Sequence, residues 1–308
     1  MKLFLRILLY LSFVFLFVYL YTKELLVIPD IQQPLFLIIS LVLVLLGFML
    51  DSKAWQTIVR IEIPEISYKH AFVSNGKFIF SKYIPGKVWI ILGKAAYLKE
   101  KYNKSVINLT SYSFFYQLIS LFAASLTGVA IVYYVDLNLF WVLVIMLAVF
   151  LIFFTILHKP ILRLASGMIS YVFKKQIIIP EVANKLSLEV FLISLFNWVV
   201  WAVAFYLFLL SMLPADSITI TMGFLFPVSS VMGIIVLFAP GGIGIREGFL
   251  IIGLTFLGVS LKEATAVAFI SRLWFLTGEF MFFISTIVLS YKPSAENNLV
   301  VTKRNSIN

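Results

Sequence analysis

The motif most able to do chemistry lies at residues 240–248, which read Pro-Gly-Gly-Ile-Gly-Ile-Arg-Glu-Gly within a strongly apolar sequence. A proline ends an incoming helix, and glycines allow positive φ angles and a close approach of the backbone. In hydrocarbon an unpaired backbone group costs several kcal/mol, so irregular backbone at membrane depth needs surrounding protein or a polar cavity. The motif is therefore a candidate functional site.

The motif has the composition of an anion receptor. The N–H groups of Gly241, Gly242 and Gly244 are expected to be free and to point outward. Together with the positive end of the next helix and the guanidinium of Arg246, they suit a phosphate or carboxylate. Arg246 and Glu247 are neighbours in sequence, and adjacent helical residues do not face each other, so each needs a partner elsewhere.

The last long apolar run, residues 264–290, offers those partners in Arg272 and Glu279, which lie seven residues apart on roughly one helix face. Arg272 stands roughly 12 Å into the run at 1.5 Å per residue, near the middle of a bilayer. Such an arginine costs about 2.5–3.5 kcal/mol on insertion and usually faces a bundle interior or a wet cavity. We expect Arg246, Glu247, Arg272 and Glu279 to line one cavity; alternatively they form a structural ion-pair cluster that touches no substrate.

A second Pro-Gly motif stands earlier in the chain. Residues 83–93 and 238–248 share an aromatic residue, then x-Pro-Gly, then a glycine eight positions after the proline. If the motif at Pro85 and Gly86 enters from the cytoplasm and the later one from outside, they form an inverted repeat of broken elements, as in many secondary transporters. The other reading is that Pro-Gly is simply a common turn dipeptide.

Two lysines follow the first Pro-Gly motif. Lys87 and Lys94 are seven positions apart, so on a helix they share a face. They either receive phosphate from the cytoplasmic leaflet or are positive-inside charges that snorkel to the interface.

The composition is that of a polytopic membrane protein. The 308 residues are 62% hydrophobic and 12% charged, with a mean hydropathy of +1.06, whereas a soluble domain has about 25% charged residues. We expect an all-α fold of about eight hydrophobic helices, some of them broken or re-entrant. One integral-membrane domain spans residues 1–291, and residues 292–308 form a polar cytoplasmic tail.

The apolar runs set the expected helices. The runs lie near residues 3–22, 34–50, 107–134, 139–158, 186–213, 218–239, 248–260 and 264–290. Residues 71–80 and 88–98 mix apolar and basic side chains and suit interfacial or re-entrant helices. The run at 248–260 covers only about 20 Å as a helix, too short for a bilayer. The sequence leaves open whether residues 218–260 form two full spans or one re-entrant pair.

The distribution of charge predicts the orientation. Lysines and arginines concentrate in residues 51–104, 159–185 and 292–308, whereas the links around Asp30, Asp136 and Asp216 hold few. By the positive-inside rule, both termini of this multi-pass protein lie in the cytoplasm, and the membrane is the plasma (inner) membrane. The net charge of +10 then reflects topology and anionic lipid headgroups, and no nucleic-acid partner is expected.

Signals for an enzyme are weak. There is no cysteine, and the only histidines, His70 and His158, have no carboxylate or thiol at ligand spacing, so no metal site is expected. Glu247 stands where a dinucleotide fingerprint needs glycine, and no cofactor is expected. A membrane glycosyltransferase that uses a polyprenyl-phosphate donor would need an acidic pair, for which Glu24 and Asp30 are thin support.

The two Pro-Gly motifs resemble the paired signatures of the lysylphosphatidylglycerol synthase transmembrane-region family, also called flippase-like integral membrane proteins. The resemblance covers nearly the whole chain. It implies a bundle with broken helices, similar to a translocator that moves modified phospholipid between leaflets. Some members have a glycine and an acidic residue where this chain has Trp89 and Ile90. Only residues 292–308 follow the last apolar run and Tyr291, so the transferase domain and synthase activity are not expected.

The leading hypothesis is therefore a protein that binds and translocates an anionic or phosphate-linked lipid in cell-envelope biogenesis. The lipid partner is a phospholipid or a polyprenyl-phosphate-linked glycan, and envelope-synthesis enzymes are further expected partners. Two alternatives remain at the level of sequence, the polyprenyl-phosphate-dependent glycosyltransferase and a non-transporting accessory subunit of envelope synthesis.

Overall fold

The computed structural model describes residues 30–84, 89–132, 167, 170, 182–236 and 242–290. Every regular element in these ranges is helical, which confirms the predicted all-α class. The apolar runs at 3–22 and 139–158 lie outside the described residues. The α-helices are α2 (Pro34–Val59), α3 (Tyr68–Gly76), α4 (Trp89–Tyr102), α5 (Val106–Thr127), α6 (Val129–Val132), α9 (Asn184–Met212), α10 (Leu225–Ile235), α11 (Ile245–Phe256) and α12 (Leu261–Ser290). The 3-10 helices are η1 (Ile79–Tyr83), η3 (Ala215–Ser217) and η4 (Ile220–Phe224).

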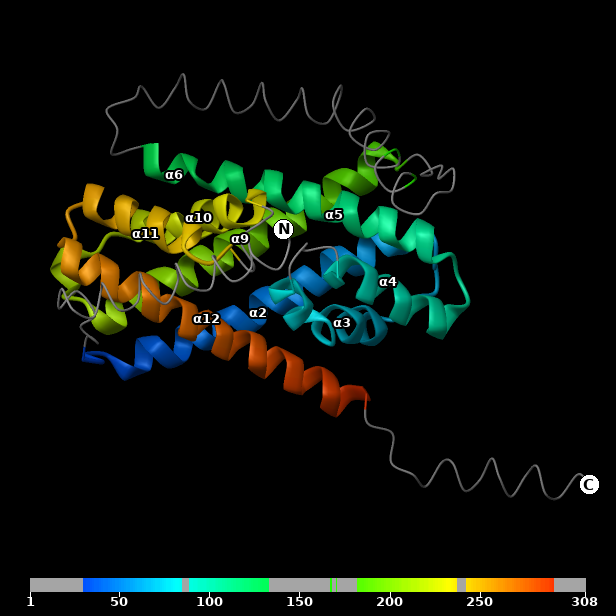
Figure 1. The fold of residues 1–308 in the computed structure, drawn as a ribbon, viewed down its shortest axis with the longest axis horizontal. Coiled ribbons are helices and arrows are strands. Elements are labelled where there is room, and N and C mark those ends of the chain that lie inside the picture. Colours follow the sequence, from blue (N-terminus) through cyan, green and yellow to red (C-terminus); the bar gives the residue numbers. More distant parts are fainter. Residues whose placement is uncertain are drawn as a thin grey trace, which may run out of the picture.

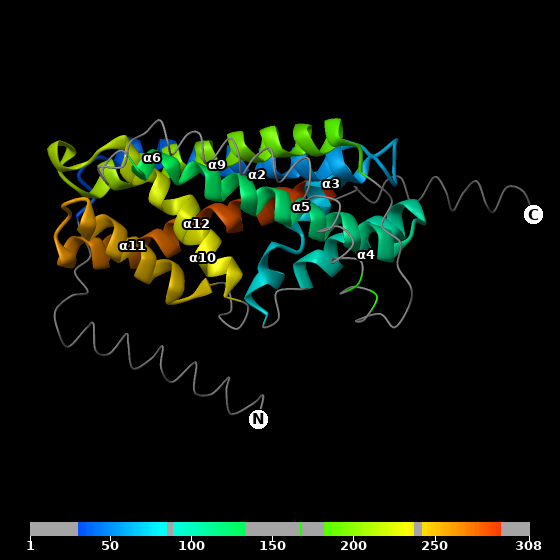
Figure 2. The same cartoon turned by 90° about the horizontal axis from the view of Figure 1, so that it is seen from above.

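Four of the described helices, α2, α5, α9 and α12, are long and apolar enough to cross a membrane. They contain 22 to 30 residues and form the body of the bundle in Figures 1 and 2. At 1.5 Å per residue even the shortest is about 33 Å long, more than the roughly 30 Å of a hydrocarbon core. The chain is thus a polytopic membrane protein, as its composition predicts.

Helix α2 runs nine residues beyond the predicted apolar run, which ended at residue 50. Asp51 does not end the helix because its carboxylate accepts hydrogen bonds from Asn75 Nδ2, at 2.6 Å, and from the hydroxyl of Tyr116. A polar residue with partners can continue a membrane helix. The outer face of the same helix carries an exposed apolar stripe, formed by Leu35, Ile38, Val42, Leu46 and Met49.

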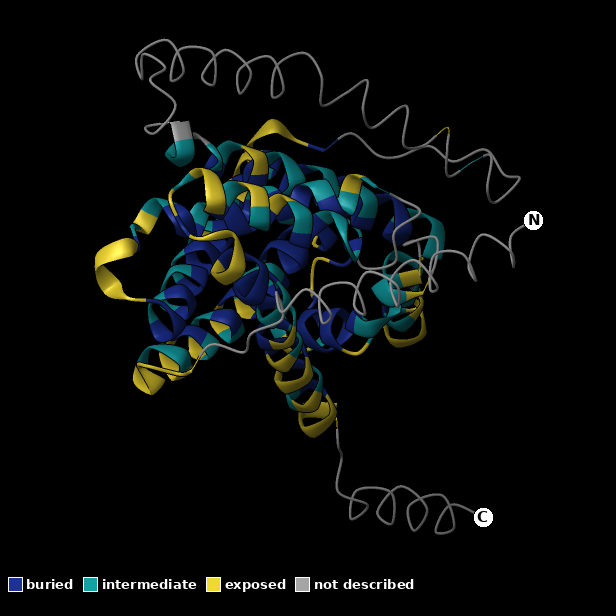
Figure 3. Cartoon of the chain, turned by 60° about the vertical axis from the view of Figure 1, so that its left-hand side comes forward, coloured by how far each residue is buried: buried dark blue, intermediate teal, exposed yellow. Residues whose placement is uncertain are grey.

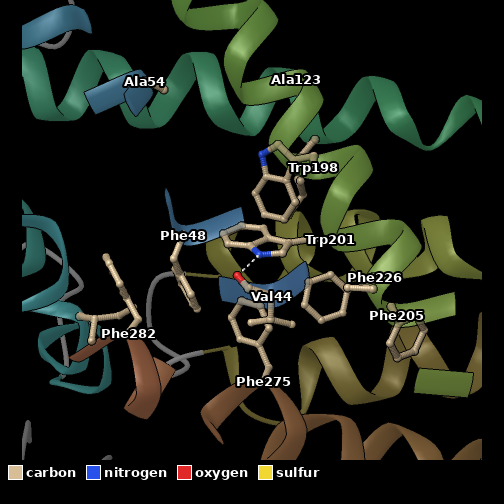
Figure 4. Packing of buried hydrophobic residues seen from close by; sticks show 14 of the residues in the cluster. Val44, Phe48, Ala54, Ala123, Trp198, Trp201, Phe205, Phe226, Phe275 and Phe282 are labelled. Atoms are coloured by element: carbon tan, nitrogen blue, oxygen red, sulfur yellow. Dashed lines mark hydrogen bonds between the residues drawn. The ribbon is translucent and has the colours of Figure 1, made fainter. Parts of the chain in front are cut away.

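Small residues let α2, α9 and α12 approach closely. A Cβ atom added to Gly47 would lie 2.0 Å from Trp201 Nε1, and one added to Gly278 would lie 2.3 Å from Val44 Cγ1. The indole of Trp201 donates a 3.1 Å hydrogen bond to the carbonyl of Val44, as Figure 4 shows. Close packing through glycine is typical of helix pairs in membranes. The ribbon segments coloured as buried gather in the interior of the bundle, and those coloured as exposed lie mostly at its outside (Figure 3).

Two groups of shorter helices flank the long ones. Figure 2 shows α10 and α11 beside one half of the bundle, and η1 and α4 beside the other half. Helix α11 has 12 residues, and α10, with η4 directly before it, makes one apolar helical segment, Ile220–Ile235. Each segment is shorter than the roughly 20 residues that a bilayer span needs. These lengths favour one re-entrant pair over two full spans for the region 218–260.

Candidate functional site

A group of five charged side chains and one tyrosine joins three separate elements of the bundle. Its members, which we name the charged cluster, are Lys82 and Tyr83 of η1, Arg246 and Glu247 of α11, and Arg272 and Glu279 of α12. Arg246 is 6% exposed and Glu279 only 1%. Three cations and two carboxylates leave one net positive charge in this buried place.

The loop before α11 sets the position of Arg246. Gly242 and Gly244 have φ angles of +70° and +85°, which side-chain-bearing residues rarely adopt. A Cβ atom on Gly242 would lie 2.8 Å from the Cα of Gly233, so the loop packs directly against α10. Gly233 was not among the predicted site residues, because a single glycine inside an apolar run is its only signal in the sequence. Gly241 lies outside the described residues.

Glu247 caps the N-terminus of α11 and also contacts Arg272 of the charged cluster. Its Oε2 accepts a 2.7 Å hydrogen bond from the amide of Gly244, and its Oε1 lies 3.6 Å from Arg272 Nη1. A carboxylate at this place stabilises the first turn of a helix. The amide of Gly244, predicted to be free for an anion, is therefore occupied by Glu247.

Glu279 is held by η1. Its Oε1 lies 2.5 Å from Lys82 Nζ, and its Oε2 accepts a 3.0 Å hydrogen bond from the hydroxyl of Tyr83. In the sequence, Lys82 is one of many basic residues before α5, and Tyr83 is the aromatic residue of the first motif. Spacing in the sequence carries no signal for a contact across 197 positions.

Arg246 has no carboxylate partner at ion-pair distance among the described residues. Its guanidinium carbon lies 4.5 Å from the ring centre of Phe226 and 5.4 Å from that of Phe275. Aromatic faces stabilise a cation there, but they accept no ordinary hydrogen bond. The buried Nε and Nη2 atoms of Arg246 form no hydrogen bond with the described part of the chain. Arg272, Glu247 and Glu279 nevertheless lie near enough to act on it electrostatically.

The structure therefore brings together the four charged residues that the sequence analysis grouped, and adds Lys82 and Tyr83 to them. Whether these side chains line a cavity stays a prediction.

Lys94 lies elsewhere. It is 3% exposed, and its Nζ lies 4.7 Å from the ring centre of Trp55 and 5.0 Å from that of Tyr116. Asp51 acts electrostatically on it. Pro85, Gly86 and Lys87 lie outside the described residues, so a face shared by Lys87 and Lys94 stays a prediction.

Among the described residues, no group of three or more His, Asp or Glu side chains could hold a metal ion. The Nδ1 atom of His70 lies 2.6 Å from the hydroxyl of Tyr102. Asp30 is exposed at the start of the described chain, whereas Glu24 and His158 lie outside it.

The apolar spans and the buried charged cluster define a polytopic membrane protein with a polar interior site. Residues 3–277 match the protein family described as "Lysylphosphatidylglycerol synthase TM region". The chain belongs to this family, which confirms the resemblance seen in its motifs and points to lipid or envelope biogenesis. Neither a curated protein nor a solved structure matches the chain.

Proposed function

We propose that this protein binds an anionic or phosphate-linked lipid and moves its headgroup across the membrane in cell-envelope biogenesis. The observation that carries the proposal is Arg246, a buried cation with two hydrogen-bond donors that have no acceptor in the described residues. Burying such donors without an acceptor is costly, and charged residues inside membrane proteins usually serve function. An anionic headgroup supplies both the missing charge and the missing acceptors.

The arrangement of the short helices supports movement as well as binding. Lys82 and Tyr83 come from the group of short helices at one half of the bundle, and Arg246 and Glu247 come from the group at the other half. Transporters with inverted repeats place their site between two such broken elements, so that either side can open toward it. We include the inverted repeat in the proposal on this ground.

The proposed setting follows the charge distribution. The protein lies in the plasma (inner) membrane with both termini in the cytoplasm, because the basic stretches then face the cytoplasm. Its lipid is a phospholipid or a polyprenyl-phosphate-linked glycan, and envelope-synthesis enzymes make or consume that lipid.

Transport of a labelled lipid in vesicles tests the proposal. Purified protein is reconstituted with phosphatidylglycerol that carries a fluorophore on one acyl chain, and a membrane-impermeant quencher reports the outer leaflet. A parallel series uses a labelled polyprenyl phosphate. For at least one of the two lipids, we expect Arg246→Ala to slow transport by about tenfold or more, because a charge-assisted pair is lost. Arg246→Lys keeps the charge without the planar donor pair and should have an intermediate rate.

Arg60→Ala is the matched control, because Arg60 is an exposed arginine at the end of α2. Its transport rate should equal that of the wild type. Thermal unfolding in the same detergent shows that each variant is folded. Wild-type rates in a folded Arg246→Ala protein, or no transport of either lipid by the wild type, would overturn the proposal.

A further inference from the structure

The two guanidinium nitrogens of Arg246 that lack a hydrogen bond have a defined geometry. Nε and Nη2, the two nitrogens without a hydrogen bond, lie on the same edge of the planar guanidinium. This edge presents two roughly parallel N–H donors, which match two oxygens of one anionic group. A phosphodiester has two free oxygens and one negative charge, which equals the single excess positive charge of the cluster.

The cluster also contains a competitor for Arg246. Glu279 is 1% exposed and acts electrostatically on Arg246, yet each of its oxygens is held by η1, one by Lys82 and the other by Tyr83. If η1 withdrew, Glu279 would be a buried carboxylate without partners close to a guanidinium without partners. A buried charge that loses its partner is strongly destabilised, so the two would pair.

Building on the proposed function, we infer that Glu279 exchanges between Lys82 and Arg246, and that this exchange switches the affinity of Arg246 for a phosphodiester lipid headgroup. Lys82 and Tyr83 are positioning residues, because they act on the headgroup only through Glu279. While they hold Glu279, no carboxylate occupies the guanidinium edge, and the lipid can bind it once the surrounding helices part. When they release it, Glu279 takes the place of the phosphate and the headgroup leaves.

The exchange would link the two halves of the bundle. Lys82 belongs to η1, Arg246 begins α11, and Glu279 lies on α12 between them. A movement of η1 would thus change the charge environment of Arg246 in α11. Since Nε and Nη2 of Arg246 are buried, the headgroup reaches them only when the surrounding helices part, a step that transporters commonly couple to their gates.

A binding cycle in detergent micelles tests the exchange. The probe is fluorescent phosphatidylglycerol, and the proteins are the wild type, Lys82→Ala, Glu279→Gln and the double variant. Lys82→Ala should bind about tenfold more weakly, because Glu279 then occupies Arg246. Glu279→Gln should bind at least as tightly as the wild type. The double variant should return to within about threefold of the wild type, because removal of the competitor makes Lys82 unnecessary.

Tyr83→Phe is the milder second variant, since it removes one hydroxyl and keeps the ring. It should weaken binding in the same direction, by less than Lys82→Ala, and Glu279→Gln should again restore it. The inference is overturned if folded Lys82→Ala and Tyr83→Phe proteins bind like the wild type. It is also overturned if Glu279→Gln fails to rescue them.

Two further arms keep the conclusions separate. If Arg246→Ala weakens binding but the Lys82 and Tyr83 variants do not, the exchange fails and the proposed function stands. If the wild type does not bind the lipid, or Arg246→Ala binds it normally, the proposed function itself fails. Glycerophosphoglycerol, which has the phosphodiester without acyl chains, should compete at least about tenfold more weakly than the lipid, because it buries no apolar chain. Equal competition would overturn the assignment of a lipid.

Discussion

Lys82 Nζ lies 2.5 Å from the Oε1 atom of Glu279, a residue 197 positions later in the chain. The contact joins the 3-10 helix η1 to the longest described helix, α12. Its two partners differ in their access to solvent, because the side chain of Glu279 is 1% exposed and that of Lys82 is 29% exposed. The carboxylate therefore depends on the lysine more than the lysine depends on the carboxylate.

We predict that Lys82→Ala lowers the free energy of unfolding by about 2–3 kcal/mol. Breaking a buried pair by removing one partner typically costs about 3–5 kcal/mol. The partial exposure of Lys82 and the pairing of the released Glu279 with Arg246 both reduce this figure. Denaturant or thermal unfolding in detergent measures the change. Lys101→Ala, which removes an exposed lysine of α4, should change the stability by less than about 0.5 kcal/mol. Equal stabilities of the two variants would contradict the prediction.

Part of the charged cluster could be predicted from local rules. Arg246 and Glu247 are adjacent and must look outward for partners, and the contact of Glu247 with Arg272 follows that expectation. Helical spacing also placed Glu279 on the face of α12 that carries Arg272. The partner of Glu279 could not be predicted, because the path that brings η1 to α12 depends on tertiary packing and not on any spacing in the sequence.

The helix boundaries also depend partly on local sequence and partly on tertiary packing. Apolar runs located α9, α11 and α12 to within about four residues at each end, because membrane helices follow apolar length closely. Helix α2 continues nine residues past its apolar run because Asp51 is stabilised by Asn75 and Tyr116, which come from other helices. Lys94 is likewise placed by the aromatic rings of Trp55 and Tyr116, and its heptad spacing from Lys87 carries no information about them.

His70, on α3 outside the four long helices, predicts a dependence of stability on pH. Burial lowers the pKa of His70 below its usual 6.5, and the nearby charges of Lys101 and Lys69 lower it further. The folded protein thus favours the neutral ring. As the pH falls from about 6.5 through the lower pKa of the folded state, the unfolded chain takes up the proton first, so stability decreases. Above 6.5 the contribution is fully present.

The difference between the wild type and His70→Gln isolates this effect. Both proteins keep His158 and every carboxylate, so their other pH dependences cancel. Unfolding curves between about pH 5 and 8 should show the wild type losing stability relative to His70→Gln as the pH falls. A constant difference across that range would show that the pKa of His70 is not shifted on folding.

The two glycines Gly242 and Gly248, six positions apart, should respond to alanine in opposite ways. Gly242 has a φ of +70°, and a Cβ atom on it would lie 2.8 Å from Gly233 Cα and 2.9 Å from the Gly233 carbonyl oxygen. Because those atoms are backbone, they cannot move aside as a flexible side chain would. We expect Gly242→Ala to lower the free energy of unfolding by at least about 1–3 kcal/mol, the usual cost of a strained backbone conformation.

Gly248 is the matched control, because a Cβ atom there meets nothing within 4 Å and the residue lies inside α11. Gly248→Ala should leave stability unchanged or raise it by about 0.5–1 kcal/mol, the gain in helix propensity.

Gly93 occupies the same position in the first Pro-Gly motif as Gly248 does in the second, but its packing differs. A Cβ atom added to Gly93 would lie 2.4 Å from Phe78 Cδ1. Gly93→Ala should therefore destabilise the protein, and equal effects of alanine at Gly93 and Gly248 would show that the two positions are packed alike. Unfolding in detergent measures all three variants, and binding of fluorescent phosphatidylglycerol should weaken only where the loop that positions Arg246 is distorted, in Gly242→Ala.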